Sequence, residues 1–231
     1  MKLGVLLPTF QPDAGEALRV AAAVAANGLD GVFCYDHLWP MGTPTRPALA
    51  PFPLLALIAT NEPTLALGPL VARVGLGGNE LLVERFATLR ALAPGRVIAA
   101  LGTGDRLSRA ENEAYGLAFD APEVRRGALA ALATELRGDE EEVWIGAGAA
   151  ATNELARTLN VTLNLWNASL DTVRDEATRA RVTWAGDLTG DVAAQLDELE
   201  AAGAAWVVGS TNVRRSALYE WRRRRGVSSV T

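Results

Sequence analysis

The chain is poor in the side chains that form disulfides and metal sites. It contains one histidine, His37, and one cysteine, Cys34, among 231 residues. One cysteine cannot form an intrachain disulfide, and one histidine with one cysteine cannot supply the usual ligand set of a zinc site. We therefore expect no bound metal, a packing role for Cys34 inside its apolar segment, and a reducing, cytoplasmic location.

Long apolar runs and a positive net charge are also missing. No run of about 18 uncharged apolar residues occurs, so we expect no membrane-spanning helix. Pro8 interrupts the apolar start MKLGVLL before any cleavage site of the secretory type, so we expect no signal peptide. The net charge of −5 argues against a nucleic-acid partner. The chain is 49% hydrophobic, which is typical of a folded protein with a large core.

Short apolar segments alternate with alanine-rich segments along the whole chain. The apolar segments read as buried parallel strands at 3–7, 31–35, 65–72, 96–101, 143–146, 161–166, 182–185 and 205–209. Segments with helical periodicity lie between them at 14–27, 51–60, 80–93, 108–116, 123–137, 152–159, 169–180, 189–202 and 213–224. This alternation predicts a parallel sheet that is covered by helices.

The number of strand–helix pairs predicts an α/β fold of the compact (β/α)₈ TIM barrel type. No break in composition divides residues 1–231, so we expect one domain. The competing fold is a doubly wound sheet, but no Gly-x-Gly-x-x-Gly motif follows the first predicted strand. In a barrel the carboxyl ends of all strands meet at one mouth, where active sites collect.

The second predicted strand ends in Asp36-His37. Imidazole is the side chain whose ordinary titration lies nearest neutrality, and a neighbouring carboxylate can help to orient a ligand or the ring. The alternative is a surface histidine that follows a strand by chance. Phe10, Trp39 and Trp166 also fall at predicted strand ends, where flat aromatic walls can hold a flat ligand.

Two predicted strand ends run into glycine-rich turns, 102–105 and 146–153. Small residues let backbone N–H groups approach a ligand, and a helix N-terminus favours an anion. The turn from Gly146 to Asn153 therefore suits the phosphate of a planar cofactor. The alternative is a tight turn that needs glycine for its geometry alone.

Four segments together resemble the luciferase-like flavin- and deazaflavin-dependent oxidoreductases. They are KLGVLLPTF, GLDGVFCYDHLWP, LALGPLVARVGLGGNELLVERFATLRALAPGRVIAALGTGD and EVWIGAGAAATNELARTLNVTLNLWNAS. The Asp-His pair and the Gly-Thr-Gly-acid turn look most like the branch that uses the deazaflavin coenzyme F420. The resemblance implies a TIM barrel that transfers a hydride between F420 and a small organic substrate.

The resemblance also implies roles for individual residues. His37 is expected beside the deazaflavin ring and Asp105 as the proton donor or acceptor, so these two are the predicted catalytic residues. A non-proline cis peptide bond is expected near Leu70-Val71, behind the ring. The predicted cofactor-binding residues are Asp36, Leu70, Val71, Thr103, Gly104, Gly146, Ala147, Gly148, Thr152 and Asn153. The predicted substrate pocket contains Phe10, Trp39 and Trp166.

The chain also departs from the family pattern. Almost nothing is inserted between Trp184 and Asp191, so the insertion that covers the substrate in relatives looks absent, and Gly77-Gly78-Asn79 replaces a basic residue followed by proline. Two alternative functions therefore stay open: an FMN-dependent monooxygenase of the same family and a non-catalytic cofactor-binding homologue. Relatives commonly dimerise through the second and third helices, so a homodimer is expected, and the apolar segment Ala48–Ala59 is consistent with it.

Overall fold

The computed structural model describes residues 1–40, 43–104, 106–138 and 142–226. Every strand in these ranges belongs to one parallel sheet with the order β3-β2-β1-β9-β8-β7-β6-β5-β4. The strands are β1 (Lys2–Leu6), β2 (Gly31–Cys34), β3 (Ala66–Pro69), β4 (Ala72–Arg73), β5 (Ile98–Gly102), β6 (Glu142–Gly146), β7 (Thr162–Trp166), β8 (Val182–Gly186) and β9 (Ala204–Gly209).

The two ends of this sheet meet, so the sheet closes into a barrel. Only Leu70 and Val71 separate β3 from β4, and β4 pairs in parallel with β5. β3 also pairs with the residue directly before β5, because Leu67 forms a parallel bridge with Val97. β3 and β4 therefore act as one interrupted strand between β2 and β5. Each of the eight predicted strand segments contains a strand, and the predicted TIM barrel is confirmed.

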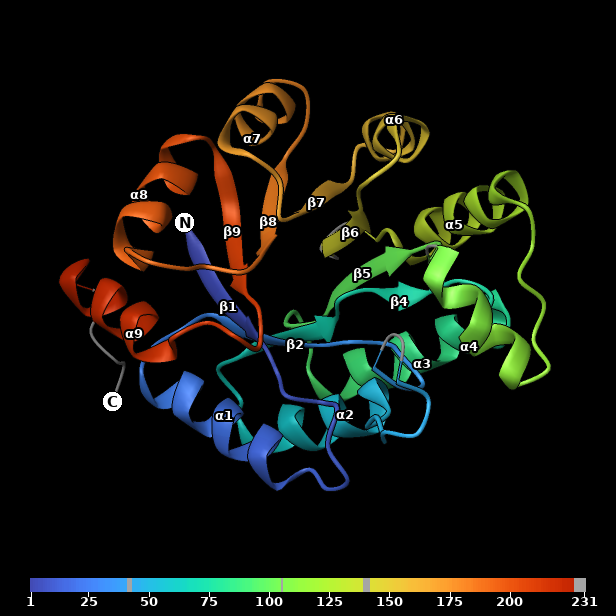
Figure 1. Cartoon of the computed structure of the whole chain (residues 1–231), viewed down its shortest axis with the longest axis horizontal. Coiled ribbons are helices and arrows are strands. Elements are labelled where there is room, and N and C mark those ends of the chain that lie inside the picture. Colours follow the sequence, from blue (N-terminus) through green and yellow to red (C-terminus); the bar gives the residue numbers. More distant parts are fainter. Residues whose placement is uncertain (41–42, 105, 139–141, 227–231) are drawn as a thin grey trace.

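Helices surround the strands on the outside of the barrel (Figure 1). They are α1 (Gly15–Ala26), α2 (Pro51–Asn61), α3 (Asn79–Leu92), α4 (Arg109–Ala114), α5 (Pro122–Leu136), α6 (Ala150–Thr158), α7 (Leu170–Ala177), α8 (Val192–Ala201) and α9 (Arg215–Arg224). Prolines stand in the first turns of α2 and α5, where the missing N–H costs no intrahelical bond. In the described part of the chain, none of these helices has the length and apolar character needed to cross a bilayer.

Strand residues alternate between two apolar cores. Val5, Val32 and Ile145 point outward and pack in the core that the strands share with the helices. Phe33, Trp144 and the similarly buried Trp206 fill the inside of the barrel together with other strand side chains. The Phe33 ring lies 5.3 Å from Trp144 and 5.8 Å from Trp206, centroid to centroid.

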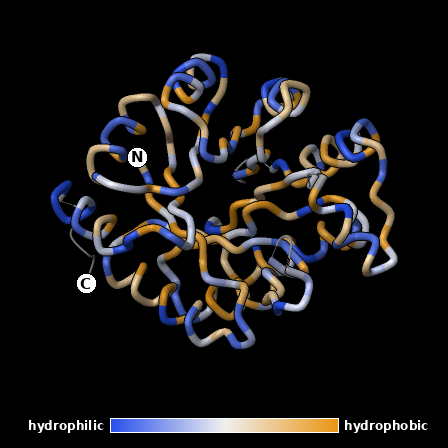
Figure 2. Tube along the Cα trace, in the orientation of Figure 1, coloured by the Kyte–Doolittle hydropathy of each residue, from blue (hydrophilic) through white to orange (hydrophobic). Residues whose placement is uncertain are grey.

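This two-faced burial explains why most strand residues are apolar, while the helices mix polar and apolar residues (Figure 2). Cys34 belongs to the outer core, as expected for a packing residue. Burial raises the pKa of its thiol, which disfavours the reactive thiolate.

Candidate active-site cleft

A cleft of about 720 Å³ opens at the carboxyl ends of the strands. Side chains from the segments after β1, β2, β3, β5, β6 and β7 line it, which is the arrangement expected for the functional end of a TIM barrel. His37 lies in its wall, and Val71 contributes to its lining from the break between β3 and β4.

Val71 forms a close contact with two strands below the cleft. The Leu70-Val71 peptide bond is cis, where the resemblance placed such a bond. A Cβ atom added at Gly102 would lie 2.4 Å from Val71 Cγ2, and one added at Gly146 would lie 3.2 Å from Val71 Cγ1. The chain therefore needs glycine at the end of β5, because any side chain there would displace Val71.

His37 is held by a carboxylate from a distant helix. Its Nδ1 lies 2.9 Å from Oε1 of Glu111 in α4, and the main-chain N–H of Leu38 donates to Oε2 of the same carboxylate at 3.4 Å. Arg73 Nη2 donates to Glu111 Oε2 at 2.5 Å. Glu111 is 1% exposed and Arg73 is 4% exposed, so a buried ion pair stands behind the histidine.

Asp36 does not contact the imidazole by a hydrogen bond, although it precedes His37 in the chain. Its Oδ2 accepts from the main-chain N–H of Arg73 at 2.9 Å, and its carbonyl accepts from Arg73 Nε at 3.0 Å. Burial raises the pKa of the Asp36 carboxyl, and the bond and charge of Arg73 oppose that rise. Asp36 lines a neighbouring groove of about 660 Å³ beside α2 and α3, and His37 lines this groove as well as the cleft.

Aromatic rings form one wall of the cleft. Phe10 stacks on Tyr35 with the ring centroids 5.4 Å apart and the planes 9° from parallel. Trp166 meets Tyr35 edge-on at 6.3 Å, and both line the cleft. Burial, with a smaller effect of the Asp187 charge, raises the pKa of Tyr35 to about 12. Trp39 points elsewhere, since it is buried and packs against Tyr115 at 5.8 Å.

The charged side chains that line the described part of the cleft are all basic. They are the arginines Arg73, Arg125 and Arg126, and no carboxylate occurs among the described lining residues. Arg125 Nη1 donates to the carbonyls of Thr103 and Gly104 at 2.6 and 2.7 Å, so it also holds the turn after β5. In a chain with a net charge of −5, this local charge favours an anionic ligand.

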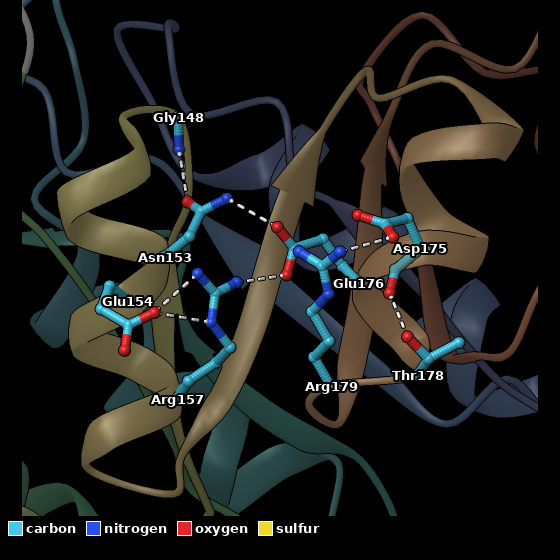
Figure 3. A network of polar contacts seen from close by, with 8 residues as sticks. All are labelled: Gly148, Asn153, Glu154, Arg157, Asp175, Glu176, Thr178 and Arg179. Atoms are coloured by element: carbon cyan, nitrogen blue, oxygen red, sulfur yellow. Dashed lines mark hydrogen bonds and ion pairs between the residues drawn. The ribbon is translucent and has the colours of Figure 1, made fainter.

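The turn before α6 lines the cleft, and part of its backbone is already hydrogen-bonded: Ala147 N–H donates to the Asn164 carbonyl at 2.8 Å and Thr152 N–H to the Ala149 carbonyl at 2.9 Å. Among the described residues no side chain caps α6, so its first-turn N–H groups lack a side-chain acceptor. Asn153 Oδ1 accepts from Gly148 N–H at 3.4 Å, and Asn153 Nδ2 donates to Glu176 Oε1 at 3.1 Å. Arg157 Nη1 donates to Glu176 Oε2 at 2.6 Å, which ties the turn to α7 (Figure 3).

The N-terminal part of the chain matches a known protein family. The model of the luciferase-like monooxygenases matches residues 1–127, which is more than half of the sequence. The chain belongs to the luciferase-like monooxygenase family.

Relatives with named functions match only part of this luciferase-like chain. The F420-dependent glucose-6-phosphate dehydrogenase of Nakamurella multipartita is 28% identical over 149 residues, which cover 64% of this chain and 42% of the dehydrogenase. The chain therefore spans less than half of that relative's length.

Solved structures share the fold over nearly the whole luciferase-like chain. An F420-dependent secondary alcohol dehydrogenase, in complex with an F420-acetone adduct, superposes with a TM-score of 0.78 at 12% identity and covers 96% of this chain and 97% of its own. A monooxygenase from Streptomyces bottropensis has a TM-score of 0.73 at 12% identity, with the same coverage.

The structure brings most of the predicted site residues of this luciferase-like barrel to the cleft. Those that line it are His37, Leu70, Val71, Thr103, Gly104, Gly146, Ala147, Gly148, Thr152, Phe10 and Trp166. Asn153 supports the turn from behind, whereas Asp36 and Trp39 lie away from the cleft. Asp105 lies outside the described residues.

The prediction missed Glu111, Arg73 and the arginines of α5. Glu111 stands in the segment Ala110-Glu111-Asn112-Glu113, where nothing in the local pattern separates it from Glu113. Glu113 is 61% exposed, as a helical glutamate usually is. In the described part of the chain no cluster of His, Cys, Asp and Glu could hold a metal ion.

Proposed function

We propose that this luciferase-like barrel binds coenzyme F420 in the cleft and transfers a hydride between it and a small organic substrate. The observation that carries the proposal is the convergence of His37, a stacked aromatic wall and the uncapped start of α6 on one cleft. The dehydrogenase relative is named as F420-dependent, which supports this choice of cofactor.

The residues present fit a planar, phosphorylated cofactor. The volume of about 720 Å³ lies inside the range of roughly 300–1,000 Å³ that is typical of ligand sites. Leu70 and Val71 would lie behind the ring, and the basic lining suits the negative charge of a phosphate. Gly146, Ala147, Gly148 and Thr152 line the cleft at the start of α6, and the positive end of this helix would attract that phosphate. When bound, the deazaflavin supplies C5 as the atom that accepts or donates the hydride.

His37 and Asp105 are the proposed catalytic residues. His37 lines the cleft and would stabilise the charge that alternates at the edge of the ring. Asp105 follows the Gly-Thr-Gly turn in the sequence and is proposed as the group that exchanges a proton with the substrate. Asn153 would act by holding the phosphate turn, and Asp36 by holding Arg73.

The substrate would lie against the aromatic side of the cleft. Phe10 and Trp166 are the proposed contacts, because both line the cleft and flank Tyr35. Only residues 187–191 separate β8 from α8, so this connection adds no cover over the mouth. An open mouth favours a substrate that the aromatic rings and the cofactor hold between them.

A titration of the purified protein with F420 and with FMN, read by ligand fluorescence, tests the proposal. We expect F420 to bind at micromolar concentration and FMN to bind more weakly. Oxygen consumption with supplied reduced FMN would instead establish an FMN-dependent monooxygenase. Tight F420 binding without any turnover, unaffected by His37→Ala, would indicate a non-catalytic homologue. If neither cofactor binds, the proposal is wrong.

We also propose that the chain forms a homodimer through α2 and α3. Leu57 on α2 and Leu81 and Leu92 on α3 are large apolar side chains that lie exposed. Burying such a surface between two copies would stabilise the pair. Light scattering should give the mass of a dimer, and Leu57→Glu with Leu92→Glu should give a monomer. A monomeric native protein would contradict this.

A cytoplasmic location and a single-domain organisation complete the proposal. Cys34 is buried and cannot pair within the chain, which agrees with a reducing compartment. All described strands belong to one sheet, so we expect one cooperative unfolding transition.

A further inference from the structure

We propose that Glu111 and Arg73 are positioning residues that hold His37 in one tautomer, with the proton on Nδ1 and with Nε2 as an acceptor at the cleft. The tautomer is a property of the protein without any ligand. Only its consequence for turnover rests on the proposed function.

The contact between His37 and Glu111 decides where the imidazole proton lies. Glu111 Oε1 is 2.9 Å from Nδ1, and an ionised carboxylate can only accept a hydrogen bond. Nδ1 must therefore carry the proton. In a neutral imidazole one nitrogen donates and the other accepts, so Nε2 is left as the acceptor.

Arg73 is the charged partner of Glu111 and fixes the orientation of its carboxylate. The guanidinium remains charged in proteins, and its Nη2 lies 2.5 Å from Glu111 Oε2. Both side chains are almost fully buried, so neither charge has water as a substitute partner. Leu38 N–H adds a second donor to the same oxygen. The carboxylate thus accepts from donors at both oxygens and has no freedom to rotate.

The imidazole lines the cleft and also the groove beside α2 and α3. His37 Nε2 has no hydrogen-bond partner within the described part of the chain, and the ring lines the cleft. Phe10 and Tyr35, which form the aromatic wall, lie 6.4 and 6.3 Å from the imidazole centroid. An acceptor nitrogen is therefore presented beside the surface proposed for the substrate.

Arg73 also explains why Asp36, which precedes His37 in the chain, does not hold the imidazole. Its main-chain N–H and its Nε bind Asp36, while its Nη2 binds Glu111. Arg73 in β4 therefore binds both the segment after β2 and α4. Arg73 follows Val71 by two residues, so the same element that shapes the floor of the cleft also aligns His37.

The tautomer can be read directly, because His37 is the only histidine in the chain. We would label the protein with ¹⁵N-histidine and record the two ring nitrogens by long-range proton–nitrogen NMR, without ligand, at a pH where the ring is neutral. The native protein should show a protonated Nδ1 and a bare, pyridine-like Nε2. A native spectrum with the proton on Nε2 would overturn the proposal, with no variant needed.

Glu111→Gln should reverse the tautomer. The amide oxygen will face Arg73, which only donates, and this leaves the NH₂ group facing Nδ1. Nδ1 must then accept, and the proton should move to Nε2. Glu113→Gln, two residues further on the same helix and exposed, is the matched control and should keep the native spectrum. If Glu111→Gln gives the same spectrum as this control, the proposal is wrong.

Turnover separates this proposal from the proposed function. If F420 is the cofactor, Glu111→Gln should lower kcat about 10–100-fold, as for other partners that orient a functional histidine, with its KM for cofactor nearly unchanged. A protein that binds no F420 but shows the Nδ1-protonated ring would reject the function and leave the positioning role standing.

Discussion

Two polar networks flank the cleft, and they differ in how far water reaches them. On one side Arg73 and Glu111 stand behind His37 with almost no exposed surface. On the other side Asn153, Arg157 and Glu176 support the phosphate turn, and Arg157 also pairs with Glu154, which is 67% exposed. Both networks link a helix to a neighbouring segment, but only the first is shielded from solvent throughout; in the second Glu176 is 8% exposed, whereas Glu154 lies largely in solvent.

This difference in solvent exposure indicates which task each network is suited to. A buried charge has no alternative partner, so its geometry is specific and its loss costs about 3–5 kcal/mol. An exposed pair exchanges its partners for water at about 0–1 kcal/mol. We therefore assign alignment of the reacting groups to the buried network and adaptable support of cofactor binding to the exposed one.

The largest expected effect is on turnover. His37→Ala removes the imidazole at the cleft and should lower kcat about 10²–10⁴-fold, the usual range for loss of a proton-handling group. Steady-state kinetics with F420 and an oxidisable alcohol panel would measure it, with Glu113→Gln as a control of unchanged rate. An unchanged kcat in His37→Ala would show that the buried network has no role in the reaction.

The next effect is on stability. Glu111→Ala leaves the Arg73 guanidinium buried without its carboxylate and should lower the free energy of unfolding by about 3–5 kcal/mol. Urea denaturation would measure this. Combining Glu111→Leu with Arg73→Met should recover part of the loss, because neither partner of the ion pair then remains charged and buried, although Asp36 loses the neighbouring charge of Arg73. A loss below about 1 kcal/mol in Glu111→Ala would mean that water reaches the pair after all.

A smaller effect is expected from the exposed network. Asn153→Ala removes one bond to Gly148 and one to Glu176, and hydrogen bonds of this kind contribute about 0.5–1.5 kcal/mol each. We expect the Kd for F420 to rise about 2–10-fold while kcat stays the same. Fluorescence titration and kinetics would separate the two. A large fall in kcat would contradict the division of tasks between the networks.

The smallest effect is a shift in titration at Tyr35, between the two networks. The phenol is neutral when protonated, so burial and the Asp187 charge raise its pKa to about 12 from the usual value near 10. The folded protein holds this proton more tightly than the unfolded chain. The resulting stabilisation is complete below about pH 10 and is lost as the pH rises towards 12.

The absorbance of ionised tyrosine would measure this shift. Tyr35→Phe should remove a step near pH 12, and Tyr115→Phe, at an exposed position, should leave that step in place. A step near pH 10 that disappears in Tyr35→Phe would show that the aromatic wall is more hydrated than its packing indicates.

The barrel and its mouth were predictable from local pattern. Strands such as Gly31–Cys34 and Ile98–Gly102 are apolar throughout because both of their faces are buried, and a glycine or asparagine marks many helix ends. Such signals depend on residues close in the chain. The position of His37 at the mouth follows from them, because a residue after a parallel strand lies at the functional end.

The partner of the histidine was not predictable in this way. Asp36 is its neighbour in sequence, yet successive residues at a strand end point in different directions, and Asp36 turns to Arg73. Glu111 lies 74 residues away and shares its local pattern with the exposed Glu113. Only the packing of α4 against the segment after β2 distinguishes the two glutamates.

The sequence by itself determined the order of strands and helices, the closure of the barrel and the collection of its strand-end residues at one mouth. These features follow from local composition, because short apolar segments alternate with segments of helical periodicity along the chain. The tertiary structure decided which charges face the cleft, which pair behind it, and which nitrogen of His37 carries the proton. Those outcomes depend on hydrogen bonds between segments far apart in the chain, and the local sequence pattern does not predict such contacts.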